Sequence, residues 1–351
     1  MSLSPFEHPY LSGLLGDEEI GALFSAAADI EAMLAFEAAL ARAQAKYGVI
    51  PEAAAERIGA ACAAFKPDIA ALDAATANDG VVIPELVKQL RAAVGPEFGS
   101  HVHYGATSQD VIDSSLMLRL KGASALIEAR LGELVAAFGR LDADYGDRPL
   151  MGRTRMQAAI PITVSARLIA WSAPLDALRD RLRSCGPALF AVQFGGAAGT
   201  LEKLGDRAAA VRAALAQDLS LADHRQWQSQ RGRIAEIAGI VSEITGSLGK
   251  FGQDMALMAQ AGDELALSGG GGSSAMPHKQ NPVAAEVLVS LARFNAVQLS
   301  GIHQSLVHEQ ERSGAAWTLE WLILPQMFAA CGAAERLALR LAGQIRRIGP
   351  E

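Results

Sequence analysis

The sequence predicts an all-α protein that consists of a central bundle of long helices and a small N-terminal helical domain. Apolar residues recur every three or four positions over several long stretches, which is the spacing of amphipathic helices. We find no convincing run of alternating β-branched residues of the kind that forms strands. Half of the 351 residues are hydrophobic, which is enough for a sizeable core and excludes a disordered chain.

The helices are expected in the following order. Residues 1–100 form short helices with breaks at Pro51, Pro67 and Pro84. A long helix then runs from 110 to about 145, and its apolar side consists of Leu116, Leu120, Ile127, Leu134, Phe138 and Leu141. Further helices are expected over 162–184, with a kink at Pro174, and over 283–306 and 316–346. The junctions between helices are marked by Pro149, Pro161, Pro187 and Pro282.

The clearest periodicity follows Arg233 and predicts a long helix packed against other helices. Its apolar residues are Ile234, Ile237, Val241, Ile244, Leu248, Phe251, Met255 and Met258. Gly246, Gly249 and Gly252 lie in the same stretch and would let a neighbouring helix approach closely. Each glycine costs about 1 kcal/mol in an isolated helix, so packing must offset that cost. We therefore divide the chain into an N-terminal domain (1–109), a central bundle (110–346) and a short tail (347–351).

The composition excludes several functional classes. A formal charge of −7 argues against a nucleic-acid-binding surface, which needs an excess of basic residues. The three cysteines are scattered without a CxxC pair, which indicates reduced thiols and neither disulfides nor a zinc site. The N-terminus has no signal-peptide pattern, and the charge-free stretch 184–201 is broken by proline and glycines. We expect a soluble, cytoplasmic protein. Only 5% of its residues are aromatic, and its small apolar side chains provide more apolar surface than a monomer needs.

Three stretches carry more polar chemistry than packing requires. The first, HVHYGATSQD (101–110), places the neutral donors of Thr107, Ser108 and Gln109 at the start of the first long helix. Because a helix N-terminus attracts anions, this is a candidate carboxylate site. The alternative is simple helix capping by Ser108 or Asp110, and the residues alone leave both open. Two nearby histidines without a third ligand do not predict a metal site.

The second and third stretches lie before two other predicted helices. GRTRMQAAIP (152–161) carries two arginines, which suit carboxylates, although a solvated basic turn is the alternative. GGGGSSAMPHKQNP (269–282) joins four glycines to a dense run of polar residues and prolines. A flexible linker would not end in such a run, so this stretch is predicted to be a loop that closes over a substrate.

In this order, the three stretches resemble the signature regions of the fumarase/aspartase superfamily. GSSAMPHKQNP matches the superfamily pattern GSSxMPxKxNP at every fixed position, and GRTRMQAAIPIT resembles its second region, GRTHxQxAxPxT. Three further segments are most similar to the class II cycloisomerase branch: QFGGAAGTL (193–201), HRQWQSQRGRIAEIAG (224–239) and HEQERSGAAWTLEW (308–321). The resemblance covers almost the whole chain. Members of the superfamily usually carry a further helical domain at the C-terminus, which we expect to be absent or reduced here.

The resemblance implies a five-helix bundle in each subunit, a homotetramer, and active sites that each combine residues of three chains. It assigns catalysis to Ser273, with Ser274 as the second choice, and to Lys279, Arg155 and Glu286. The substrate-binding residues that it implies are His103, Thr107, Ser108, Gln109, Arg153, Gln157, Ser274, Met276, His278, Asn281 and Arg312. No metal and no organic cofactor are implied, and the partner is a small di- or tricarboxylate.

One position departs from the superfamily pattern. Arg155 stands where many members have a histidine that pairs with a glutamate, and Glu286 occupies the glutamate's position. We therefore expect an Arg155–Glu286 ion pair. Arginine does not release its proton, so it suits a carboxylate leaving group with a pKa of about 4 better than an amine that must be protonated.

The activity that this implies is cycloisomerisation of 3-carboxy-cis,cis-muconate to 4-carboxymuconolactone in protocatechuate breakdown through β-ketoadipate. The carboxylate would add across a double bond through an aci-carboxylate, and Ser273 would protonate the carbon. The alternatives are an adenylosuccinate- or argininosuccinate-type lyase, a cycloisomerase for a substituted muconate such as sulfomuconate, and a non-catalytic, crystallin-like protein.

Overall fold

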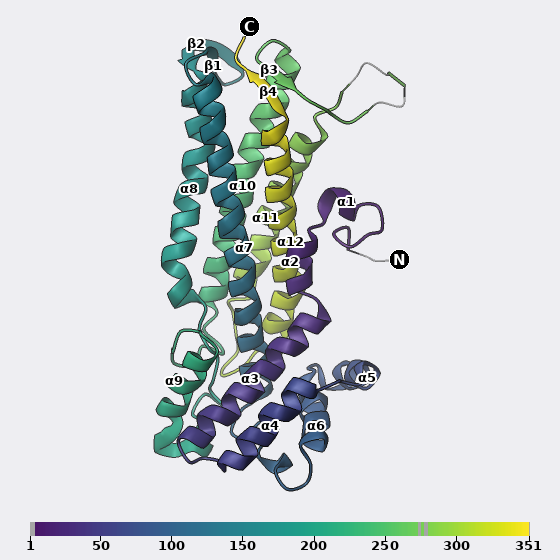
Figure 1. Ribbon diagram of the computed structural model, residues 1–351, viewed down its shortest axis with the longest axis vertical. Helices are drawn as coiled ribbons and strands as arrows, with labels where there is room; N and C mark the ends of the chain where they lie inside the picture. The colour runs from purple at the N-terminus through teal and green to yellow at the C-terminus, as the bar shows by residue number, and fades with distance from the viewer. Residues whose placement is uncertain (1–3, 273–274, 277–279, 351) are drawn as a thin grey trace.

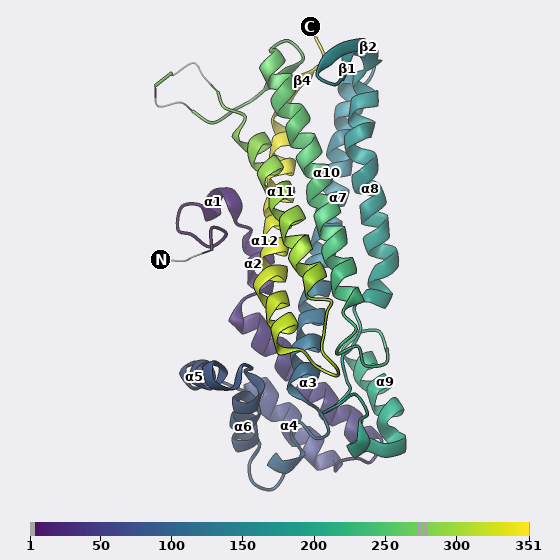
Figure 2. The ribbon, with the colours of Figure 1, turned by 180° about the vertical axis from the view of Figure 1, so that it is seen from behind.

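Long helices that run side by side dominate the computed structural model, which describes residues 4–272, 275–276 and 280–350 (Figure 1). The helices of the bundle are α7 (Ser108–Tyr145), α8 (Val164–Leu189), α10 (Gly232–Ala261), α11 (Val283–Gln304) and α12 (Gly314–Gln344). Figure 2 shows the same bundle from behind, with α10 and α11 in front. The fold is therefore all-α, as predicted.

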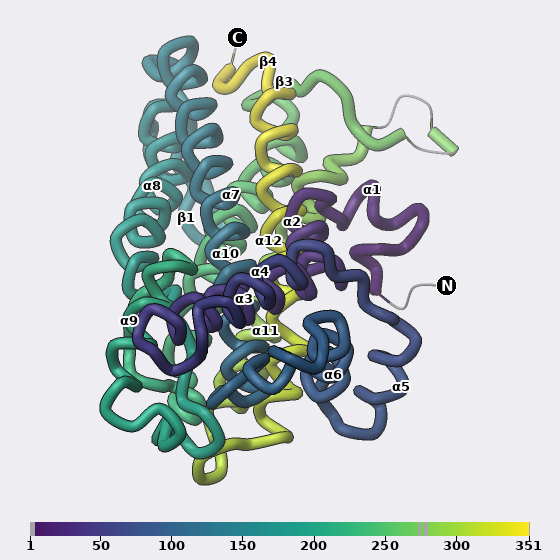
Figure 3. The backbone as a smooth tube through the Cα atoms, turned by 60° about the horizontal axis from the view of Figure 1, so that its bottom comes forward, coloured from purple at the N-terminus to yellow at the C-terminus, as the bar shows by residue number. Residues whose placement is uncertain are grey.

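Shorter helices cover one end and one side of the bundle. They are α1 (Ser12–Leu15), α2 (Glu18–Leu23), α3 (Ala26–Lys46), α4 (Glu52–Ala64), α5 (Ile69–Asp79), α6 (Ile83–Val94) and α9 (Ala208–Asp218), with 3-10 turns η1 (Gly99–His101) and η2 (Glu202–Arg207). Figure 3 shows α3 crossing the lower end of the bundle, with α4, α5 and α6 beyond it. This end contains the start of α7 and the connection between α11 and α12.

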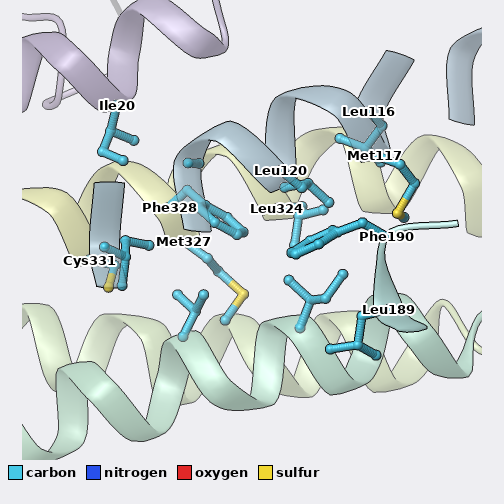
Figure 4. Close-up of a cluster of buried hydrophobic side chains, with 14 of the residues drawn as sticks. Ile20, Leu116, Met117, Leu120, Leu189, Phe190, Leu324, Met327, Phe328 and Cys331 are labelled. Carbon is cyan, nitrogen blue, oxygen red and sulfur yellow. The ribbon is translucent and has the colours of Figure 1, made fainter. Parts of the chain in front are cut away.

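The core of the bundle confirms the predicted apolar faces of α7 and α10. All the predicted apolar residues of both helices are buried. Figure 4 shows how Leu116 and Leu120 of α7 meet Leu324 and Phe328 of α12 beside Phe190. The burial of whole rows of apolar side chains on one face of each helix is what the three-four spacing predicts.

Two of the three glycines that were predicted to admit a neighbouring helix permit the close contact of α10 with α11. A Cβ atom at Gly252 would lie 2.6 Å from the Ala285 carbonyl oxygen, and one at Gly249 would lie 2.5 Å from the Cβ of Ala292. Gly246 faces open space within this chain, so the predicted close approach is confirmed only for the other two.

Substitution of Gly252 by alanine is expected to lower the free energy of unfolding by about 1–3 kcal/mol, because α11 must move to make room for the added carbon. Gly59→Ala in α4 is the matched control, since nothing lies within 4 Å of its added carbon. That variant should be neutral or more stable by up to about 1 kcal/mol. Urea unfolding followed by circular dichroism measures both, and equal stabilities of the two variants would contradict the packing argument.

Two small antiparallel strand pairs were not predicted, and only the first of them is a hairpin. β1 (Pro149–Thr154) pairs with β2 (Gln157–Thr163), and β3 (Leu265–Leu267) pairs with β4 (Ile345–Ile348). The expected helix over 316–346 therefore ends at Gln344, and Pro161 lies in a strand. The expected helix over 162–184 continues to Leu189, so that Pro187 lies inside its last turn.

Two helices, α11 and α12, are long and apolar enough to span a membrane by composition alone. In α12, 67% of the most apolar stretch is buried inside the protein, and α11 packs against both α10 and α12 (Figure 2). In α11 only 28% of that stretch is buried, so one face packs on the bundle while much of the helix surface stays exposed in the single chain.

Candidate functional site

The first motif forms the N-terminus of α7. Thr107 is the N-cap residue, and its backbone N–H donates to Oδ2 of Asp110 at 3.0 Å. The capping interpretation is thus correct in kind but wrong in position, since neither Ser108 nor Asp110 is the N-cap. Thr107 and Ser108 are half-buried at the positive end of a helix of 38 residues, where an anion is favoured.

Asp110 fastens a second segment to the start of α7. Oδ1 accepts from Gly195 N at 2.8 Å and Gln193 Nε2 at 3.1 Å, and Oδ2 also accepts from Gly196 N at 2.9 Å. Burial raises the pKa of this carboxyl to about 6, against the lowering effect of these N–H donors. Asp110 therefore holds the QFGG segment (193–196) against the N-terminus of α7.

Gln109 is buried, and both ends of its amide are used inside the protein. Nε2 donates to Asp113 Oδ2 at 3.1 Å and to the Gln228 carbonyl at 2.8 Å. Oε1 accepts from Arg312 Nε at 2.9 Å. The two N–H donors of the Gln109 side chain are both used inside the protein, so its side-chain amide has no donor left for a substrate carboxylate. Gln109 instead holds Arg312 near the helix start.

A cavity of about 710 Å³ lies beside this N-terminus. Its lining includes Ser108, Arg312, Trp317 and Trp321, together with residues 79–81, which the sequence analysis did not identify. Trp317 is buried and donates from Nε1 to Asp113 Oδ1 at 3.0 Å. The cavity thus combines aromatic walls, one guanidinium and the end of a long helix, which suits an unsaturated, anionic ligand.

A buried charge cluster lies directly behind the cavity. Arg231 donates to Asp113 (NH1 to Oδ2, 2.5 Å) and to Glu320 (Nε to Oε1, 2.8 Å), and none of these side chains is exposed. Burial alone would raise the pKa of Glu320, but hydrogen bonds and charge from Arg231 hold it below its ordinary value. The cluster joins α7, α10 and α12 at the site. In the sequence, the only indication of this cluster was that Arg231 and Glu320 lie within the segments 224–239 and 308–321.

His103, the histidine of the first motif, lies in the loop before α7. Its Nδ1 is 2.6 Å from Oε1 of Glu37 on α3. Glu37 was not among the predicted site residues, although a single carboxylate in the otherwise apolar run 32–41 of α3 was a usable signal.

The second motif forms the β1–β2 hairpin at the other end of the bundle (Figure 1). Arg155 and Met156 occupy its turn with φ of 48° and 66°, and Thr154 pairs with Gln157 across it. Arg153 donates to Glu264 Oε1 at 2.8 Å. Met156 and Ile160 are 73% and 67% exposed, an unusual state for large apolar side chains in a two-stranded hairpin.

The third motif is closed at its base by main-chain hydrogen bonds. Gly271 N donates to the Asn281 carbonyl at 2.9 Å, and Asn281 N donates to the Gly271 carbonyl at 2.8 Å. Met276 is 42% exposed. Four predicted site residues, Ser273, Ser274, His278 and Lys279, lie outside the described residues.

The length of α7 keeps the motifs of one chain apart. Its 38 residues span about 57 Å at 1.5 Å per residue, with the first motif at one end and the second at the other. The third motif lies at the same end as the second, on another side of the bundle (Figure 1). A small carboxylate cannot contact both ends of one chain.

The predicted Arg155–Glu286 ion pair is absent from the described part of this chain. Glu286 lies in the first turn of α11, and Arg155 lines a different cavity of about 660 Å³ with Arg153 and Arg167. Within a single chain the two residues do not meet, because the hairpin and α11 occupy different sides of the bundle (Figure 1).

The comparisons with known proteins agree with this fold. The sequence matches the Lyase family over residues 18–296. The chain belongs to this lyase family, within the fumarase/aspartase superfamily. It is 43% identical to the 3-carboxy-cis,cis-muconate cycloisomerase of Pseudomonas aeruginosa, over 91% of this chain and 72% of that protein. It is 40% identical to the enzyme of the same name from Pseudomonas putida, over 91% of this chain and 78% of that protein.

A solved structure gives the same result. The 3-carboxy-cis,cis-muconate lactonizing enzyme from Pseudomonas putida superimposes with a TM-score of 0.90 at 38% sequence identity. The match covers 96% of this chain and 77% of that one.

Proposed function

We propose that this protein is a cycloisomerase, an intramolecular lyase that converts 3-carboxy-cis,cis-muconate into the γ-lactone 4-carboxymuconolactone. The observation that carries this proposal is the 43% identity with an enzyme of that name over 91% of the chain. The cavity at the α7 N-terminus adds a site suited to an unsaturated anion. The reaction belongs to protocatechuate breakdown through β-ketoadipate, and the enzyme is proposed to be cytoplasmic.

The mechanism that we propose adds one carboxylate of the substrate to its distal double bond. The new C–O bond forms as the π electrons move toward a second carboxylate, which becomes an aci-carboxylate. Lys279 and Asn281 stabilise this charge, and Ser273 then delivers a proton to the carbon. Thr107, Ser108, Arg312 and His103 bind the remaining carboxylates at the α7 N-terminus.

We further propose a homotetramer in which each active site combines motifs of three chains. The separation of about 57 Å along α7 supports this, because only different chains can bring both ends of the bundle to one substrate. The exposed Met156 and Ile160 would then be covered by a neighbouring subunit. In such an assembly an Arg155–Glu286 pair forms between chains.

Arg155 is expected to act as a permanent cation for the carboxylate that adds and leaves. Arg155→Ala should lower kcat/KM about 100-fold or more, since a charge-assisted contact to the reacting carboxylate is lost. Arg155→His should recover only part of the activity, and less of it as the pH rises and the imidazole loses its charge. Steady-state lactonisation rates between pH 6 and 9 measure this.

Arg167→Ala provides the matched control, because Arg167 lines the same cavity but has no proposed contact with the reacting carboxylate. It should change kcat/KM less than about threefold. Full activity of Arg155→Ala would contradict the assigned role.

The proposed activity is tested by following the ultraviolet absorbance of 3-carboxy-cis,cis-muconate with the wild-type protein and with Ser273→Ala. Loss of absorbance with the wild type, and at least about a 1000-fold slower loss with Ser273→Ala, is expected. No reaction of the wild type would overturn the proposal. Release of fumarate from adenylosuccinate or argininosuccinate would identify a lyase, and turnover of sulfomuconate alone would identify a different cycloisomerase.

A further inference from the structure

Two buried polar side chains of α3 hold the loop that precedes α7. Glu37 Oε1 is 2.6 Å from His103 Nδ1, and Gln44 Nε2 donates to the Tyr104 carbonyl at 2.6 Å. Glu37 and Gln44 are seven positions apart, so they lie two turns apart on the same face of the helix. Both are at most 2% exposed. α3 thus uses two buried positions to hold one short loop.

The backbone of this loop is strained at His103. Its φ of 63° lies in the left-handed region, which non-glycine residues seldom adopt. Such a conformation costs about 1–3 kcal/mol and persists only where the surroundings hold it, which is most often at functional sites. The bond between Glu37 and the ring and the bond from Gln44 to the next carbonyl help to hold it, together with the bond from Arg91 to the Val102 carbonyl.

The two nitrogens of His103 have different surroundings. Nδ1 is bonded to Glu37, whereas Nε2 makes no hydrogen bond to any described residue and is not among the buried, unpartnered atoms. The side chain is 13% exposed. Nε2, which does not bond to Glu37, is therefore the accessible nitrogen of the ring.

Charged groups face the ring from three elements. Glu37 comes from α3, Asp110 from α7 and Arg91 from α6. Burial lowers the pKa of His103 and so does Arg91, but the charge and hydrogen bond of Glu37, together with Asp110, raise it above its ordinary value overall. Oε2 of Glu37 has no hydrogen-bond partner among the described residues, so the imidazole of His103 is the main partner of this carboxylate.

We propose that Glu37 is a positioning residue that keeps His103 as a fixed imidazolium, with Nε2–H presented to a carboxylate of the substrate. This rests on the proposed function, which supplies a tricarboxylate. With Nδ1–H donated to Glu37, a neutral ring would present a bare Nε2 that can only accept, so Nε2–H is presented to the site only by the imidazolium. His103 then adds a cationic donor to Arg312 and the α7 N-terminus.

This role predicts an effect on binding and little effect on chemistry. The bound carboxylate keeps the same charge in the ground state and the transition state, so His103 stabilises both alike. Removal of the Glu37 charge should therefore raise KM and leave kcat nearly unchanged. The loss should grow with pH, because the imidazole of the variant is neutral at a lower pH than that of the wild type.

The first experiment measures the pKa of His103 itself, without substrate. The protein is labelled with 13C-histidine and titrated by NMR, and the His103 signal is identified by its loss in His103→Gln. In the wild type the pKa should exceed the ordinary value of about 6.5, and in Glu37→Gln it should fall by about 1 or more. A wild-type pKa at or below the ordinary value would overturn the proposal, and this measurement remains informative if Glu37→Gln does not fold.

The second experiment compares kinetics of the wild type and Glu37→Gln at pH 6 and pH 8.5. We expect KM for 3-carboxy-cis,cis-muconate to rise about tenfold at pH 8.5 and less at pH 6, with kcat within about threefold of the wild type. An equal fall in kcat at both pH values would contradict a positioning role. Absence of any turnover by the wild type would refute the proposed function and leave the NMR result to decide the role of Glu37.

Gln44→Met is the matched control. It removes the neighbouring hydrogen bond to the same loop but changes no charge near the ring. It should lower stability without moving the pKa of His103. A shift as large as that of Glu37→Gln would mean that loop position, and not the Glu37 charge, sets the state of His103.

Discussion

Mixing two inactive variants, Arg312→Ala and Ser273→Ala, is expected to restore up to about a quarter of the wild-type activity. Arg312 lies beside the N-terminus of α7, whereas the described base of the third motif lies toward the other end of that helix, which spans about 57 Å (Figure 1). If one site takes Arg312 from one chain and Ser273 from another, random reassembly leaves some sites with both residues intact. Each variant alone should be slower than the wild type by at least about 100-fold.

The experiment is done by dissociating and reassembling the two variants together and measuring lactonisation. The control is reassembly of Ser273→Ala with Asn281→Ala, because both substitutions lie in the third motif and no chain then has that motif intact. That mixture should stay inactive, because Gly271 and Asn281 close the same loop in one chain. Failure of the first mixture to regain activity, despite proven subunit exchange, would contradict shared sites.

Removal of the Arg231 guanidinium is expected to have the largest effect on stability. Arg231→Met leaves the carboxylates of Asp113 and Glu320 buried without a cation, which should cost about 3–5 kcal/mol. Gln109 and Trp317 also bond to Asp113, so the loss should extend to the site. Urea unfolding measures the stability, and KM reports the displacement of Arg312.

Arg42→Met is the control for this experiment. Arg42 pairs with Asp218 at 2.7 Å, but its side chain is 54% exposed, so solvent screens the interaction. Its loss should stay below about 1 kcal/mol. If Arg231→Met proves too unstable to isolate, Arg231→Lys keeps the charge with fewer bonds and should lie between the two. Equal stabilities of Arg231→Met and Arg42→Met would contradict the importance of burial.

The long helices were predictable because their apolar residues are buried within one chain. The row from Ile234 to Met258 is buried along its whole length, as the three-four spacing requires. The β1–β2 hairpin was not predictable in the same way. Its turn uses Arg155 and Met156 with positive φ instead of glycine or asparagine, and its strands expose Ile160 instead of alternating buried and exposed residues.

The candidate site was predictable in part, because motifs show which residue types occur but not which partners they meet. Thr107, Ser108 and Arg312 lie together, whereas Gln109 is committed to Asp113 and Arg312. The roles of all the predicted site residues stay predictions, as does the division of the chain at 109 and 346. Glu37 and Arg231 escaped notice because a buried charge is recognised only once its partner from a distant segment is in place.

Because α7 is one continuous helix between the two ends of the bundle, it limits where the protein can accept inserted residues. Each residue inserted into α7 would rotate the β1–β2 hairpin by about 100° about the helix axis and move it by about 1.5 Å. Seven residues would nearly restore the direction, to within about 20°, but would displace the hairpin by about two turns. Variation in length is therefore tolerable in the loops at either end of α7 and not within it, so the number of residues between Thr107 and Pro149 is itself a constrained property of the sequence.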